Sequence, residues 1–269
     1  MTSINTQRGA ETLPSPSVYD EAYFLSSACE GLRDYLAGGI ASLKSRELDH
    51  LDPKRGELVL DLGCGRGESS AEIKRRGALP VAMDYSPDAV RLTRETLAGG
   101  MVVRADAANL PFRPGVFSGI LMGDVIEHLP WAMGVGMLHE VDRTLVPGGR
   151  ALVHTSPNTW FILIVKRPLQ LAMRLLGRTE VVDRFAEYDR LRSVMHPNEL
   201  NPLSIRRLLR HSGLDATTWV DPDVIRSGQS EWTENLSKSP LIRLLARIAG
   251  SWPFRLVLGN DMFALIVKR

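Results

Sequence analysis

The chain has 269 residues, of which 44% are apolar and 24% are charged, and its formal net charge at pH 7 is +2. This length and composition predict one folded α/β domain with insertions rather than two full domains. The net charge is small, and no basic patch contains aromatic residues. The overall charge therefore does not indicate a nucleic-acid-binding protein. No window approaches the ~20 apolar residues that a membrane span needs.

The N-terminal part divides into a tail and a helical segment. Residues 1–16 are polar with two prolines, so we expect a disordered tail and no signal peptide. Residues 17–57 are expected to form a helical cap, which either covers a pocket or packs on the sheet. The two cysteines, Cys29 and Cys64, form no Cys-x-x-Cys motif, which favours a reducing cytoplasm.

A glycine-rich turn follows the first apolar run. The sequence LVLDLGCGRGES begins at Leu58, which predicts a buried strand, a tight turn and the start of a helix. Glycine permits positive φ and a close ligand, and a helix start offers free N–H groups. A dinucleotide-binding turn requires Gly-x-Gly-x-x-Gly. Here the third glycine comes one position earlier, in Gly63, Gly65 and Gly67.

Two further acids end the next predicted strands. Asp84 ends an apolar run 21 residues after Gly63, where a Rossmann-like sheet places a ribose-binding carboxylate. Ser86 and Pro87 then predict a helix N-terminus. Asp106 follows the third apolar run.

Together these motifs resemble those of the class I S-adenosylmethionine-dependent methyltransferases, especially the ubiquinone- and menaquinone-pathway type. The resemblance covers residues 58–156 strongly and leaves the first fifty uncovered. It implies that Asp106 and Ala107 face adenine. The residues expected to bind S-adenosylmethionine are Asp61, Gly63, Cys64, Gly65, Gly67, Asp84, Tyr85, Asp106, Ala107 and Asp124.

Strands and helices alternate along the chain, which predicts a mostly parallel sheet. The expected strands are 58–62, 79–84, 101–103, 117–122, 150–155, 214–220 and 262–267. The resemblance implies a Rossmann-like, seven-stranded sheet with helices on both faces and an antiparallel last strand. We therefore expect one methyltransferase domain over residues 17–269.

Two segments, 157–201 and 221–260, exceed the minimal pattern and are expected to be inserted lid helices. Residues 157–179 contain four cations and no acid, and so do residues 235–260. An apolar stripe at helical spacing runs through each segment. These features predict either lids that pack on the domain or helices that touch an anionic membrane surface.

The run from Asp124 to His128 occupies the end of the fourth strand and resembles the Glu-x-x-Glu-His motif of metal-using O-methylating relatives. Asp124, Glu127 and His128 could bind Mg²⁺, although Mg²⁺ prefers oxygen ligands; alternatively, Glu127 and His128 hold the turn by hydrogen bonds. His128, His154 and His196 are the candidate general bases, because histidine titrates near neutral pH.

The resemblance implies an enzyme that moves a methyl group from S-adenosylmethionine to a small or lipid-like acceptor, most simply to a hydroxyl oxygen. Methylation of carbon or nitrogen is an alternative. A nicotinamide-dependent oxidoreductase, which the glycine spacing disfavours, and a cofactor-binding protein without catalysis are alternatives from other classes. The sequence does not identify the acceptor.

Overall fold

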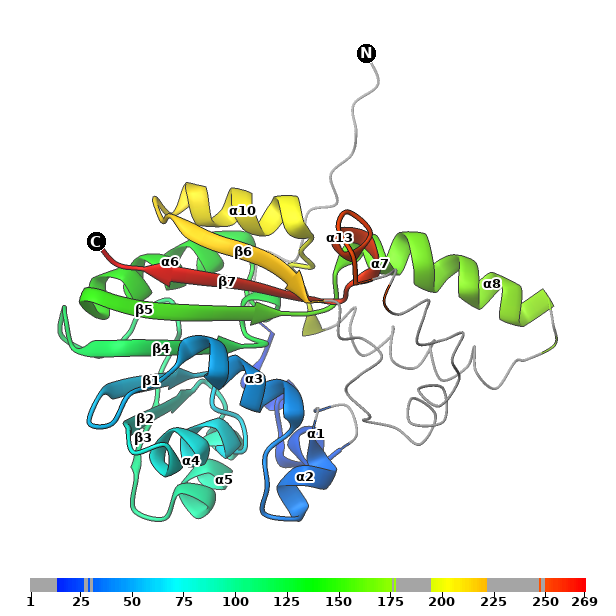
Figure 1. Ribbon diagram of the computed structural model, residues 1–269. Helices are drawn as coiled ribbons and strands as arrows, with labels where there is room; N and C mark the ends of the chain where they lie inside the picture. The colour runs from blue at the N-terminus through cyan, green and yellow to red at the C-terminus, as the bar shows by residue number, and fades with distance from the viewer. Residues whose placement is uncertain are drawn as a thin grey trace.

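A computed structural model describes residues 14–26, 29, 31–175, 177, 195–221, 247 and 250–269 (Figure 1). The predicted tail, apart from its last three residues, and much of both insertions lie outside these residues. The strands are β1 (Leu58–Leu62), β2 (Leu79–Asp84), β3 (Met101–Arg104), β4 (Phe117–Gly123), β5 (Leu145–Thr155), β6 (Ala216–Asp221) and β7 (Asp261–Val267).

The helical elements are distributed between and around these strands. They are η1 (Pro16–Val18), α1 (Glu21–Phe24), α2 (Leu32–Leu36), α3 (Ser42–Leu51), α4 (Glu68–Arg75), α5 (Pro87–Leu97), η2 (Ile126–His128), α6 (Trp131–Thr144), α7 (Thr159–Phe161), the π-helical η3 (Ile162–Lys166), α8 (Arg167–Leu175), α10 (Pro202–His211) and α13 (Arg255–Leu258).

The seven strands form one sheet in the order β3-β2-β1-β4-β5-β7-β6. The first five strands are parallel, whereas β7 pairs antiparallel with both β5 and β6. This confirms the predicted sheet and its antiparallel last strand. The largest boundary difference is β5, which begins five residues before its predicted start.

Side chains alternate between the two faces of the sheet, as the pleat requires. Val59 and Leu121 pack with α3 and α4 through Leu48 and Ile73. On the other face, a larger apolar cluster joins residues of β1 and β4, among them Leu60, Ile120 and Met122, to α6 and α10. Helices therefore cover both faces of the sheet (Figure 1).

The predicted N-terminal cap is not one long helix. Four short elements replace it, and Gly31 and Gly38 have positive φ angles of 77° and 73° that interrupt a helical path. The longest of these elements, α3, packs against β4 and β5. The segment before α3 approaches the carboxyl ends of the strands. One part of the predicted cap therefore packs on the sheet, and another part lies at the strand ends, as a cover over a pocket would.

The first insertion begins with α7, η3 and α8, and α8 extends away from the sheet (Figure 1). Leu163, Ile164, Leu171 and Leu175 on this segment are exposed. The stripe predicted at Leu241, Leu244, Leu245 and Ile248 lies outside the described residues. In the part of the chain that the structure describes, no helix combines the length and apolar character needed to cross a membrane.

Candidate functional site

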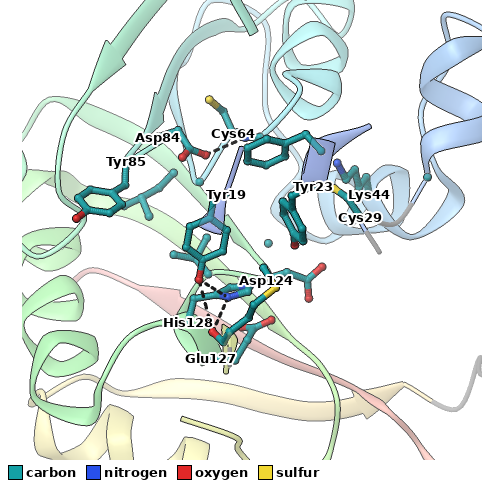
Figure 2. Close-up of a pocket in the computed structure, with 18 of the residues that line it drawn as sticks. Tyr19, Tyr23, Cys29, Lys44, Cys64, Asp84, Tyr85, Asp124, Glu127 and His128 are labelled. Carbon is teal, nitrogen blue, oxygen red and sulfur yellow. Dashed lines mark hydrogen bonds between the residues drawn. The ribbon is translucent and has the colours of Figure 1, made fainter. Parts of the chain in front are cut away.

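A cavity of about 1170 Å³ lies beyond the carboxyl ends of the parallel strands. Figure 2 shows the glycine turn and Asp84 on one side, and His128 and Glu127 on the other. We call these sides the cofactor half and the acceptor half. The predicted site residues that line the cavity are Gly63, Cys64, Gly65, Asp84, Tyr85, Asp106, Ala107, Asp124, Glu127, His128 and His196.

Glycine is required sterically at Gly63. Its φ angle is 82°, and a Cβ there would lie 2.3 Å from Cγ2 of Val125. The turn therefore places its backbone against the loop that follows β4. Gly67 serves a different purpose, because it is the N-cap residue directly before α4 and leaves room for Thr93. Unlike Gly63 and Gly65, Gly67 does not line the cavity.

Asp84 is held by the backbone on both of its carboxylate oxygens. Gly65 N donates to Oδ2 at 3.0 Å, and Ser86 N donates to Oδ1 at 2.8 Å. Burial raises the pKa of Asp84, while these N–H groups oppose the rise. Each carboxylate oxygen retains a lone pair. Asp84 can therefore still accept hydrogen bonds from a ribose in the cavity.

Asp106 is also fixed locally, because its Oδ1 accepts a hydrogen bond from Ala108 N at 2.9 Å. Ala107 between them is buried against the main core. The three loops after β1, β2 and β3 thus present carboxylates and backbone groups to the cofactor half. The orientation of these carboxylates is fixed by hydrogen bonds from residues close in the sequence or from the adjacent glycine turn.

Asp61 does not reach the cavity. It is 3% exposed, and Ser70 Oγ of α4 donates to its Oδ2 at 2.5 Å. Burial raises the pKa of this carboxyl from 3.8 to about 6. Asp61 alternates in β1 with Leu60 and Leu62, so its side chain lies on the face that α4 covers. Asp61 therefore contacts Ser70 beneath the glycine turn and does not line the predicted cofactor site.

Asp124 directly follows β4 and has a φ angle of 53°. Its side chain is 37% exposed and lines the cavity. Although burial by itself would raise its pKa, the charge of the nearby His154 ring lowers the pKa of Asp124 to about 2. The carboxylate is therefore charged at neutral pH.

Glu127 lies three residues further on and is 1% exposed. Thr155 Oγ1 donates to its Oε2 at 2.9 Å. Burial and the nearby Asp124 charge raise the pKa of Glu127 well above its usual value. A protonated carboxyl group can donate a hydrogen bond, so Asp124 and Glu127 offer different chemistry on one turn.

His128 is oriented by two groups from distant parts of the chain. Its Nδ1 is 2.9 Å from the carbonyl oxygen of Met195 and 3.0 Å from the hydroxyl of Tyr19. Because a carbonyl oxygen only accepts, Nδ1 carries the hydrogen, and Nε2 of a neutral ring has a free lone pair. Burial lowers the pKa of His128, which favours this neutral form.

The other two candidate bases lie in different surroundings. The ring of His196 is 4.6 Å from that of His128, edge to face, and lines the cavity. His154 is fully buried and does not line the cavity. The expectation that His154 could meet an acceptor directly therefore disagrees with its position, because residue 154 lies on the face of β5 that α3 covers.

The residues predicted to hold Mg²⁺ do not form one ligand set. Asp124 groups with Glu47 and His154, whereas Glu127 groups with His128 and His196. Both sets contain imidazole nitrogen, while Mg²⁺ demands oxygen ligands. The residues present therefore do not fit a magnesium centre.

Comparison with known proteins agrees with this geometry. Residues 59–149 match the profile of a methyltransferase domain family. The chain is 36% identical to the demethylmenaquinone methyltransferase of Corynebacterium kroppenstedtii over 120 residues, which is 44% of this chain and 50% of that protein. It is 28% identical to the ubiquinone biosynthesis O-methyltransferase of Xylella fastidiosa over 181 residues, covering 64% and 68% of the two chains.

A solved S-adenosylmethionine-dependent methyltransferase from Archaeoglobus fulgidus has the same fold. Its TM-score is 0.56 at 18% identity, and the match covers 88% of this chain and 98% of that one. The chain therefore has the class I methyltransferase fold, and its residues 59–149 match a methyltransferase domain family. The aligned region spans about half the length of the first curated relatives it matches.

The candidate site also contains residues that the sequence did not single out. Tyr19 and Met195 orient His128, and Glu47 lies beside His154. Tyr19 and Glu47 come from the N-terminal segment, outside the motifs of the family. The one available signal was the run of aromatic residues around Tyr19, which the sequence equally allowed to pack on the sheet.

Proposed function

We propose that the protein transfers a methyl group from S-adenosylmethionine to a hydroxyl oxygen of a small or lipid-like acceptor. The observation that supports this most directly is the placement of Asp84 and the glycine turn across one cavity from His128 (Figure 2). The volume of about 1170 Å³ exceeds the roughly 300–1,000 Å³ of a typical small-molecule site. Two reactants therefore have room to lie side by side.

The methyl donor supplies a carbon that is already activated by a positive sulfur, so the protein must align the acceptor and remove its proton. His128 is the proposed base. Its Nδ1–H is held by Met195, so the lone pair of Nε2 can accept the hydroxyl proton as the carbon–oxygen bond forms and the carbon–sulfur bond of the donor breaks, with S-adenosylhomocysteine as the leaving group. General-base assistance typically contributes about 10²–10⁴-fold, and alignment contributes several kcal/mol more.

The segment 19–24, which we call the strap, connects the two halves of the cavity. Ser86 Oγ donates to the carbonyl oxygen of Tyr19 at 2.6 Å, and Arg66 donates to that of Phe24 at 3.0 Å. The hydroxyl of Tyr19 meanwhile contacts His128. The strap thus joins the loops of the cofactor half to the proposed base, which supports a role in shielding the reaction from water.

The decisive experiment compares cofactors by calorimetry. S-Adenosylmethionine and S-adenosylhomocysteine should bind at micromolar concentrations, and NADH should not bind. Binding of NADH, with neither methionine nucleoside bound, would contradict the proposal. A screen of phenolic and lipid-like alcohols, read as a mass increase of one methyl group, then identifies the acceptor. Methylation of only amines or carbon acids would exclude oxygen as the target.

We further propose peripheral contact of α7, η3 and α8 with an anionic membrane. The exposed apolar residues on this segment accompany the cations Arg167 and Arg174, and no acid occurs between residues 157 and 179. Each cation near an anionic surface contributes about 1 kcal/mol, which salt weakens. Among the remaining cations of residues 157–179 and 235–260, Arg178, Lys238 and Arg243 lie outside the described residues.

Sedimentation with anionic vesicles tests this contact. The protein should pellet with them at low salt, and less of it should pellet as salt rises. Arg167→Glu combined with Arg174→Glu should reduce binding and leave cofactor affinity unchanged. Arg94→Glu combined with Arg104→Glu, on the opposite edge of the sheet, controls for total charge. If the unmodified protein remains in the supernatant at low salt, a soluble acceptor is favoured.

A further inference from the structure

A buried histidine lies among three carboxylates directly beneath the cavity. Nδ1 of His154 is 2.9 Å from Oε1 of Glu47 and 3.1 Å from Oδ1 of Asp124. Nε2 of the same ring is 3.6 Å from Oδ1 of Asp261. The four residues come from α3, β5, the loop after β4 and the start of β7, so the cluster joins four separate parts of the fold.

The charges in this cluster require a cation. Glu47 is only 2% exposed, and a buried carboxylate without a partner is costly. A neutral imidazole has one N–H group, whereas both ring nitrogens of His154 lie within 3.6 Å of carboxylate oxygens. Burial alone would lower the pKa of His154, but Asp124, Asp261 and Glu47 outweigh it and raise that pKa well above its usual value.

His154 holds both the side chain and the backbone of Asp124. In addition to the contact with the ring, Asp124 N donates to the carbonyl oxygen of His154 at 3.2 Å. The φ angle of 53° at Asp124 is uncommon for a residue other than glycine, and such a conformation persists only where its surroundings fix it. The backbone carbonyl of residue 154 holds the main chain of Asp124, and the imidazole ring lies against its carboxylate.

The neighbouring glycine makes room for the cluster. A Cβ at Gly123 would lie 2.9 Å from Oε2 of Glu47. The absence of a side chain at Gly123 therefore leaves room for the Glu47 carboxylate of α3. Gly123 does not serve a turn, because its φ is not positive. The N-terminal segment is thereby coupled to the floor of the cavity through the Glu47 side chain.

We propose that His154 is a positioning residue, which holds the Asp124 carboxylate in the cavity so that it presents a fixed negative charge to the cationic methyl donor. This inference rests on the proposed function, because it assumes that S-adenosylmethionine occupies the cavity. His154 acts through Asp124 and does not touch either reactant. The sequence had offered His154 only as a candidate base.

A double-mutant cycle separates positioning from a purely structural role. His154→Gln and Asp124→Asn should each weaken the binding of S-adenosylmethionine about tenfold in calorimetry. The double variant should bind no more weakly than Asp124→Asn alone. His50→Gln is the matched control, since the rings of His50 and His154 both pack on Phe263, and His50 does not line the cavity. It should bind like the unmodified protein.

Several results would overturn the inference. Unchanged affinity in folded His154→Gln would do so, as would a full additional loss when this change is added to Asp124→Asn. If the unmodified protein binds neither S-adenosylmethionine nor S-adenosylhomocysteine, the proposed function itself fails, together with the recognition role. The two failures are therefore distinguishable.

A second measurement needs no variant to fold. Long-range ¹⁵N–¹H spectra of the unmodified protein, with histidine signals assigned, should show His154 protonated on both nitrogens at pH 8. A neutral ring at pH 8 would contradict the arrangement. Metal analysis after exhaustive dialysis should find no stoichiometric divalent ion, because an ion bound by Glu47, Asp124 and His154 would replace the proton and overturn the proposal.

Discussion

The two halves of the cavity are held together in different ways. In the cofactor half, Asp84 and Asp106 accept hydrogen bonds from backbone N–H groups two residues away, and Asp84 also accepts one from the glycine turn. In the acceptor half, His128 is oriented by Tyr19 and Met195, which are 109 and 67 residues away in the sequence. A local arrangement recurs wherever its motif occurs, whereas a long-range one depends on the whole fold.

This difference predicts that substitutions in the two halves have separate effects. The cofactor half is built on strand ends and backbone, which tolerate substitution elsewhere. The acceptor half draws on the strap and on Met195, which lies within the first insertion. Changes in the cofactor half should therefore affect cofactor binding, and changes in the acceptor half should affect transfer.

The largest expected effect is that of Gly63→Ala. Its positive φ and the approach of Val125 together should lower the free energy of unfolding by about 4 kcal/mol, from backbone strain plus overpacking. Gly148→Ala is the matched control, because Gly148 has a φ of 76° with nothing within 4 Å of the added Cβ. Urea denaturation should show a clearly smaller loss for the control. Equal losses of unfolding free energy in the two variants would mean that the Val125 side chain moves aside without an energetic cost.

Asp61 tests whether an acid of the glycine motif can lie outside the cofactor half. Its pKa is higher in the folded chain than in the unfolded one, so the folded state binds the proton more tightly. Stability should therefore fall as pH rises from about 4 to about 6, by at most about 3 kcal/mol.

Asp61→Asn should remove this part of the pH dependence, measured by urea denaturation at pH 4, 5, 6 and 8. Asp215→Asn is the control, since the side chain of Asp215 is 84% exposed. A variant with the same pH dependence as the unmodified protein would show that Asp61 is not the group responsible.

Asp84→Ala should weaken the binding of S-adenosylmethionine by roughly 1–3 kcal/mol, because hydrogen bonds to a charged acceptor are lost. Calorimetry measures the change, and circular dichroism verifies the fold. Asp49→Ala, at a side chain that is 65% exposed, should leave the affinity unaltered. An unchanged dissociation constant in folded Asp84→Ala would place the ribose elsewhere.

The smallest expected effect is that of Tyr19→Phe, which removes one hydroxyl from His128. The rate of methyl transfer to the acceptor found by the screen should fall about fivefold to tenfold, equivalent to roughly 1 kcal/mol for one hydrogen bond. Cofactor affinity should not change. Tyr35→Phe is the control, because that hydroxyl contacts Thr96 instead. A loss of cofactor affinity without a loss of rate would indicate that Tyr19 acts on cofactor binding and not on His128.

The sequence by itself determined the sheet and the cofactor half. Apolar runs that end in acids mark strand ends, and the ends of parallel strands meet at one edge of the sheet. That reasoning brought the glycine turn, Asp84 and Asp106 together without any knowledge of distant contacts. The antiparallel last strand followed from the family resemblance, and the structure confirms it.

Only the tertiary structure decided which side chains enter the cavity. Successive residues of a strand point to opposite faces, and no local pattern states which face borders the cavity. Asp61 and His154 therefore face α4 and α3, although both lie near strand ends that line the site. The contact of Tyr19 with His128 joins segments 109 residues apart, and its formation depends on every element packed between them.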